Sequence, residues 1–219
     1  RQLWNANELT TDEAICCWGD EGIPAFNFNQ WSASHPMLKG FYYRLYFGVT
    51  MCNYYLTEFS EHDAQMTAEI RFLRAMYYYH LMDCFGNVPF MTTVSNEKAS
   101  QYTRQQMYDF IEKELTECEK DMVAPQTNTY GRPDQAAAWM LFARLYLNAE
   151  VYPGTAQWAK AANYAEKIMN SGYKLHTKGT EEWSAYQMLF MGDNGENGAQ
   201  VEAILPLLQD GITSTSYGT

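Results

Sequence analysis

AEIRFLRAMYYYHLMDCFGNVPF, residues 68–90, decides the fold class of this chain. Apolar side chains recur around it at spacings of three and four, the pattern of a helix packed on a core. The predicted buried stripe is Met66, Ile70, Leu73, Tyr77, Leu81 and Cys84. Asp63 is a candidate N-cap, Gly86 can end the helix, and Val88-Pro89 forces extended chain. The sequence therefore predicts one long helix with a sharp stop.

A second helix is predicted before this one. Its apolar stripe is Leu38, Tyr42, Leu45, Val49, Cys52 and Leu56. Only a few polar residues, Ser60-Glu61-His62, separate the two helices. So short a connection favours an antiparallel helix hairpin.

A third helix is predicted after a polar linker over residues 91–102. Thr103 and Gln106 match a capping box, in which a threonine and a glutamine satisfy each other's backbone N–H groups. The apolar stripe that follows is Met107, Ile111, Leu115, Cys118 and Met122.

Two further helices complete the helical part. Pro133 suits the first turn of a helix that runs to Ala149, and another helix begins at Thr155 and ends near Gly172. Recurring helix pairs predict a mostly α fold, an α-α superhelix of degenerate tetratricopeptide-like repeats with little β structure. The repeats are degenerate because the pairs start at uneven intervals along the chain.

Three segments of one domain follow from this pattern. Residues 1–37 are rich in loops and aromatic residues, residues 38–175 form the helical scaffold, and residues 176–219 change character. In the last segment we expect a helix over Glu181–Met191 and a strand over Val201–Leu208. Because the chain begins without methionine and stops abruptly, we expect a domain truncated at both ends.

The composition narrows the classes of ligand. The chain has 219 residues, a net charge of −11 and 47% hydrophobic residues. An acidic chain is a poor match for nucleic acid or an anionic membrane surface, whereas neutral ligands such as sugars stay compatible. No apolar run is long enough to span a bilayer. Three of the five cysteines, Cys52, Cys84 and Cys118, lie on apolar stripes, so we expect them to be buried.

No catalytic residues, metal site or cofactor can be assigned. The four histidines are isolated, and motifs of nucleophilic, phosphate-binding or zinc chemistry are missing from the sequence. The stretch Asp193–Asn197 offers several oxygen atoms, but a tight turn explains it better than a calcium loop.

The first segment carries the residue types that suit a sugar ligand. A sugar offers apolar C–H faces and hydroxyl groups, so its site needs aromatic platforms beside planar polar groups. Trp18, Asp20 and Glu21, with Arg1 at the start of the chain, supply these types. The alternative is that Trp18 and Trp31 only pack this segment onto the helices.

Several blocks of the sequence closely resemble the SusD/RagB family of glycan-binding outer-membrane lipoproteins, and its starch-binding members above all. The blocks occur in the family's order: NELTTDEA (7–14), AEIRFLRA (68–75), FGNVPF (85–90), YGRPDQAA (130–137), ARLYLNAEVY (143–152), YAEKIMNSGYKL (164–175), LFMGDNGEN (189–197) and ILPLLQDG (204–211). This resemblance implies tetratricopeptide-like helix pairs that carry a loop-rich ligand face.

The resemblance also implies a function without catalysis. Family members hold glycan, here starch or malto-oligosaccharide, at the cell surface for uptake through a SusC-like TonB-dependent transporter. It further implies a surface-exposed lipoprotein of the outer membrane. Two alternatives stay open: a different glycan, or a peptide- or protein-binding scaffold of tetratricopeptide type. An enzyme is the third and weakest class.

The family's glycan site transfers to this chain position by position. Starch-binding members open this segment with an arginine, where Arg1 stands, and continue with two tryptophans around one intervening residue. Trp18 matches the second tryptophan, whereas Cys16 replaces the first. The asparagine that follows in those members falls on Asp20 or Glu21. The resemblance therefore implies a ligand site of Arg1, Trp18, Asp20 and Glu21 that lacks one aromatic platform.

Overall fold

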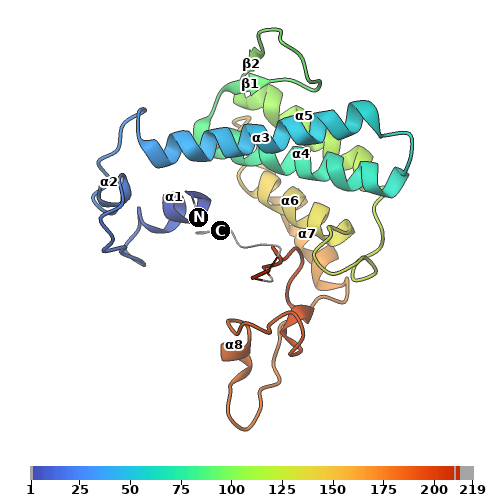
Figure 1. Cartoon of the computed structure of the whole chain (residues 1–219). Coiled ribbons are helices and arrows are strands. Elements are labelled where there is room, and N and C mark those ends of the chain that lie inside the picture. Colours follow the sequence, from blue (N-terminus) through green and yellow to red (C-terminus); the bar gives the residue numbers. More distant parts are fainter. Residues whose placement is uncertain (1, 210, 213–219) are drawn as a thin grey trace. The chain divides into compact units, whose positions relative to one another are not determined.

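The structure, a computed structural model, describes residues 2–209, 211 and 212. Within that range the chain forms eight α-helices, one 3-10 helix and two short strands (Figure 1), so the predicted mostly helical class is confirmed. Two compact units can be distinguished, one of Arg1–Met51 with Gln209–Thr219 and one of Cys52–Leu208. Each is described by itself. In the part described, no helix is both long and apolar enough to cross a membrane.

Four helices make up most of the larger unit. They are α4 (Ala64–Phe85), α5 (Arg104–Cys118), α6 (Gln135–Leu147) and α7 (Trp158–Met169). The most extensive contacts join α4 to α5 and α6 to α7, and Figure 1 shows both pairs side by side. Fewer contacts join α5 to α6. Buried alanines such as Ala138 in α6 and Ala161 in α7 allow this close approach.

The buried face of α4 differs from the predicted stripe. Of the six predicted residues only Leu81 is buried, and Cys84 is exposed. The residues that face the core are Ala68, Glu69, Phe72, Arg74, Ala75, Tyr78, Tyr79, Leu81 and Met82. The prediction was wrong because α4 carries a second apolar stripe of the same spacing, Ala68, Phe72, Ala75, Tyr79 and Met82, and it is this stripe that is buried, together with the charged Glu69 and Arg74.

Both ends of α4 match their predictions. The Asp63 carboxylate accepts a hydrogen bond from the Met66 N–H at 3.0 Å, and Gly86 ends the helix with φ of 76°. Strand β1 (Val88–Phe90) follows and pairs antiparallel with β2 (Ser100–Tyr102). The last three residues of the linker expected over residues 91–102 therefore form strand β2.

Helix α5 begins and packs as expected. Thr103 and Gln106 form the capping box, and the predicted stripe from Met107 to Met122 is buried throughout. Helix α6 is capped by Asp134, whose carboxylate accepts hydrogen bonds from the N–H groups of Ala136 and Ala137. Pro133 therefore precedes the cap and does not occupy the first turn, which corrects the sequence prediction.

The segment after α7 is less regular than predicted. Helix α8 (Ala185–Met188) is much shorter than the predicted Glu181–Met191. No strand forms over Val201–Leu208; instead, a 3-10 helix spans Ala199–Val201. The strand prediction fails because this stretch finds no strand to pair with among the described residues, and an isolated strand leaves its backbone groups unpaired.

The smaller unit contains more helix than expected. It holds α1 (Gln2–Glu8), α2 (Ile23–Asn27) and the first part of α3 (Pro36–Glu58). Leu9, Ile23 and Phe26 form its buried apolar cluster. This cluster packs against the loop between α1 and α2, which carries the predicted ligand residues Trp18, Asp20 and Glu21.

The cysteine predictions are confirmed at two of three positions. Cys52 and Cys118 are buried, whereas Cys84 is exposed at the end of α4.

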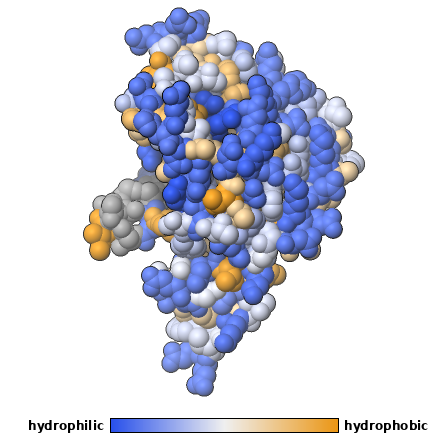
Figure 2. Space-filling view, turned by 90° about the vertical axis from the view of Figure 1, so that its right-hand side faces the viewer, coloured by the Kyte–Doolittle hydropathy of each residue, from blue (hydrophilic) through white to orange (hydrophobic). Residues whose placement is uncertain are grey.

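Most of the face drawn in Figure 2 is hydrophilic, with hydrophobic residues scattered over it.

Candidate functional site

Three of the four predicted ligand residues, Trp18, Asp20 and Glu21, lie on the loop between α1 and α2. Trp18 exposes 64% of its surface, and Asp20 and Glu21 next to it are exposed as well. The structure thus presents an aromatic ring and two carboxylates to solvent on one short loop. Arg1, the fourth predicted residue, lies outside the described residues.

An asparagine on α2 holds this loop in place. The Asn27 side-chain amide donates to the Cys16 carbonyl at 2.7 Å and accepts from the Cys16 N–H at 3.4 Å. The Cys16 side chain packs against the cluster around Phe26. Cys16 therefore attaches the loop to α2 and to the apolar cluster, two residues before Trp18. We call this pair of hydrogen bonds between Asn27 and Cys16 the clasp. The sequence alone does not predict it, because Asn27 resembles any other polar loop residue.

A histidine supports the other end of the loop. The Leu38 N–H donates to His35 Nδ1 at 3.3 Å, so Nε2 carries the proton and donates to the Gly22 carbonyl at 3.0 Å. Gly22 has φ of 96°, and a Cβ there would lie 2.8 Å from the His35 ring. His35 is thus a structural histidine, and Gly22 is required for both its conformation and its closeness to the ring.

The tryptophans of this unit differ in their roles. Trp31 contacts Phe26 edge to face, with ring centroids 5.9 Å apart, so packing describes it well. Trp31 exposes 44% of its surface, less than Trp18. Trp18 is thus the more exposed of these two tryptophans, at 64%.

The charged residues of AEIRFLRA serve the scaffold of the larger unit. Buried Glu69 accepts hydrogen bonds from Arg132 at 2.8 Å and from Asn128 at 2.9 Å. Buried Arg74 donates to Glu114 at 2.6 Å and to Asn53 at 3.0 Å. Glu69 and Arg74 each have partners within the scaffold, so neither side chain is available to a ligand. The Glu69–Arg132 pair also joins the block AEIRFLRA to the block YGRPDQAA.

The turn at Asp193–Asn197 satisfies its own polar groups. Asn197 donates to the Asp193 carboxylate at 3.0 Å, and Asn194 donates to the Leu189 carbonyl at 2.8 Å. This geometry suits the turn predicted from the sequence. Within the described residues, no group of three or more histidine, cysteine or acidic side chains is arranged to hold a metal ion.

The fold and the sequence together identify the family. The family described as SusD-like, starch-binding associating with outer membrane, matches residues 9–147. This match covers more than half of the chain, so the chain belongs to the SusD-like family.

Individual relatives agree with this assignment. The chain is 41% identical over 224 residues to the starch-binding protein SusD of Bacteroides thetaiotaomicron, an alignment that covers 100% of this chain and 39% of that protein. The chain therefore spans well under half of that relative's length.

Solved structures share the fold. A SusD superfamily protein from Parabacteroides distasonis has a TM-score of 0.71 at 27% identity, over 86% of this chain and 41% of that chain. A structure described with xylogluco-oligosaccharide has a TM-score of 0.73 at 22% identity, over 92% of this chain and 42% of that chain. At such identity the second similarity shows the fold alone.

Proposed function

We propose that this chain is part of a non-catalytic glycan-binding protein that takes starch-type α-glucan. The observation that carries this proposal is the 41% identity with a starch-binding protein over the whole of this chain. Identity that extends from end to end supports a shared function more strongly than fold does, because one fold can host many functions.

The loop after α1 supplies chemistry that fits this ligand. The exposed Trp18 ring can stack on the C–H face of a sugar ring, and the carboxylates of Asp20 and Glu21 can accept hydrogen bonds from its hydroxyl groups. Arg1 would add a donor. Because the loop is clasped to α2 through Cys16, little ordering of its backbone is needed on binding, which favours affinity.

The position of Cys16 bears on which glycan is preferred. The starch-binding pattern has a tryptophan there, whereas the Cys16 side chain packs against the apolar cluster of Leu9, Ile23 and Phe26. Trp18 is then the one aromatic platform that this pair of positions provides. We expect weaker binding of a curved glucan helix than a pair of platforms would give, and a different glycan is the main alternative.

The proposal extends to partners and location. We propose delivery of the glycan to a SusC-like TonB-dependent transporter and attachment to the outer membrane as a surface-exposed lipoprotein. Association with the outer membrane is supported by the family's description, starch-binding associating with outer membrane. The transporter and the lipid anchor rest on the resemblance of the sequence blocks to the family.

Isothermal titration calorimetry with maltoheptaose tests the proposal, with laminarin and xyloglucan oligosaccharides as other glycans. Heat of binding with maltoheptaose, and no release of shorter sugars on long incubation, is the expected result. If the chain binds only another glycan, the α-glucan assignment is wrong. Bound peptide on purification, without a response to any glycan, would favour a peptide-binding scaffold instead.

A further inference from the structure

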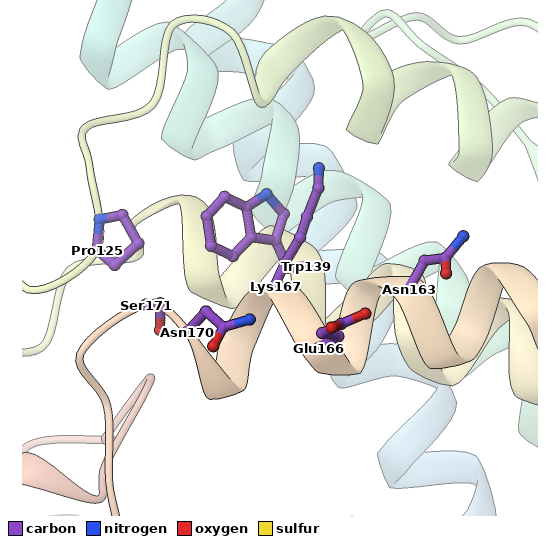
Figure 3. A pocket seen from close by; sticks show the side chains of 7 residues that line it. All are labelled: Pro125, Trp139, Asn163, Glu166, Lys167, Asn170 and Ser171. Carbon is purple, nitrogen blue, oxygen red and sulfur yellow. The ribbon is translucent and has the colours of Figure 1, made fainter.

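A groove lies on the larger unit, between α6, α7 and the loop that precedes α6. Its lining residues, which define the α7 groove, are Pro125, Trp139, Asn163, Glu166, Lys167, Asn170 and Ser171 (Figure 3). Its volume of about 540 Å³ is of the size that takes a small molecule. None of the residues predicted to bind glycan belongs to it.

The aromatic wall of the α7 groove is held rigidly. The Trp139 indole N–H donates to Glu119 Oε1 at 2.6 Å, and the Lys167 ammonium lies 3.3 Å from the same oxygen atom. That ammonium also lies over the rings of Trp139 and Tyr164, 5.2 Å and 4.6 Å from their centroids. These contacts fix the position of the Trp139 ring, and Glu119 balances the charge of Lys167.

The opposite wall is polar and comes from one face of α7. Asn163, Glu166 and Asn170 follow one another at spacings of three and four, so they align along the helix. All three are exposed. Across the residues that the structure describes, their side chains make no hydrogen bond to the rest of the chain. Two amides and a carboxylate thus face the groove with their hydrogen-bonding capacity unused.

We propose that the α7 groove binds neutral sugar, as a second contact for the glycan. The rings of Trp139 and Pro125 offer an apolar wall, and the amides of Asn163 and Asn170 can each donate to and accept from hydroxyl groups. A ligand that uses both walls must carry an apolar face and several hydroxyl groups. Sugars have this combination.

Charge and polarity select among ligands. Glu166 disfavours an anion, and Lys167 is already engaged by Glu119, so a neutral ligand fits the groove. An apolar peptide side chain would leave the two amides without partners, which costs binding energy. This inference rests on the proposed function for the glycan's biological role, while the groove's own chemistry points to sugar.

The test is a ¹H–¹⁵N NMR titration of the chain with maltotriose. It follows the indole N–H signals of Trp139 and Trp18 and the side-chain amides of Asn163 and Asn170. We expect a saturable shift of the Trp139 signal. The double variant Asn163→Ala, Asn170→Ala should weaken that response about fivefold or more, because two hydrogen bonds to the ligand are lost. Both residues are exposed, so the fold should tolerate the change.

The matched control is Asn96→Ala. Asn96 is exposed and does not line the α7 groove, so the response of Trp139 should be unchanged. A Trp139 signal that does not move, or that moves equally in the double variant, overturns the inference. If Trp18 responds and Trp139 does not, the proposed function stands without the groove. The reverse pattern supports the groove and counts against the predicted loop site.

Discussion

The Arg74 guanidinium donates a hydrogen bond to the Glu114 carboxylate at 2.6 Å, and both side chains are buried. A second nitrogen of Arg74 donates to Asn53 Oδ1 at 3.0 Å, and Asn53 in turn donates to the Met91 carbonyl at 2.9 Å. One arginine thereby joins α3, α4, α5 and the chain after β1. Arg74, the second arginine of the block AEIRFLRA, therefore stabilises the scaffold.

Replacing Arg74 should destabilise the protein strongly. Arg74→Met removes the charge-assisted hydrogen bond to Glu114, whereas Arg71 still pairs with that carboxylate. The expected loss is therefore about 1.5–3 kcal/mol, below the cost of a buried charge that is left without a partner. Urea unfolding followed by circular dichroism measures this loss. Lys113→Met is the control, since the exposed Lys113–Glu117 pair should contribute less than about 1 kcal/mol. Equal effects of both variants would contradict this view of Arg74.

Tyr78 secures the chain where it leaves β1. Its hydroxyl donates to the Met91 carbonyl at 2.7 Å and accepts from the Met91 N–H at 3.0 Å. Tyr78→Phe removes both bonds and should lower the free energy of unfolding by about 1–3 kcal/mol. Tyr54→Phe, at a residue with half of its surface exposed, should leave it nearly unchanged, and urea unfolding compares the two variants. A neutral Tyr78→Phe would mean that water replaces the hydroxyl.

Local features of the fold could be predicted from the sequence. The caps at Asp63 and Thr103 depend on residues three positions apart, and the buried stripe of α5 follows a simple apolar period. The buried face of α4 could not be predicted in this way. Glu69 and Arg74 are buried because of partners 63 and 40 positions away in the chain, which a local pattern does not contain.

In the candidate site, too, some features could be predicted from the local sequence and others could not. The residue types around Trp18 pointed to the loop, and the structure places Trp18, Asp20 and Glu21 there in exposed positions. The clasp between Asn27 and Cys16 and the α7 groove could not be predicted. The clasp depends on how α2 folds back, and the groove brings together Pro125, Trp139 and α7 from separate parts of the chain.

Trp18→Ala should weaken glycan binding. Loss of a stacking platform should cost at least about 1 kcal/mol, the usual threshold for an important contact residue. Calorimetry with maltoheptaose measures the change. Trp158→Ala is matched in residue type and exposure, 60% against 64%, and it lines neither the loop nor the α7 groove. Unchanged affinity in Trp18→Ala would assign Trp18 to packing.

The cysteines should differ sharply in reactivity. Burial raises the pKa of Cys52 to about 11 and that of Cys118 to about 12, so neither forms the reactive thiolate near neutral pH. Cys17 is exposed. With iodoacetamide at about pH 8, Cys17 should be modified first, and Cys52 and Cys118 only after unfolding in urea. Peptide mass spectrometry identifies the modified sites, and early modification of Cys118 would show that α5 opens readily.

His80 should make the protein sensitive to acid. Burial lowers the pKa of His80, with the Asp83 charge opposing and the Arg144 charge adding to this shift. In the unfolded chain a histidine has a pKa of about 6.5, so below that pH the unfolded state binds more protons than the folded state. Stability therefore falls as the pH drops below about 6.5 toward the lower folded pKa, and this contribution does not change above about 6.5.

The variant His80→Gln removes the titrating group. The loss of unfolding free energy between about pH 7.5 and about pH 5.5 should be smaller in His80→Gln than in the unchanged protein. Urea unfolding at the two pH values measures it. His62→Gln, at an exposed histidine, should keep the pH dependence of the unchanged protein. If His80→Gln keeps it as well, the acid sensitivity does not arise from His80.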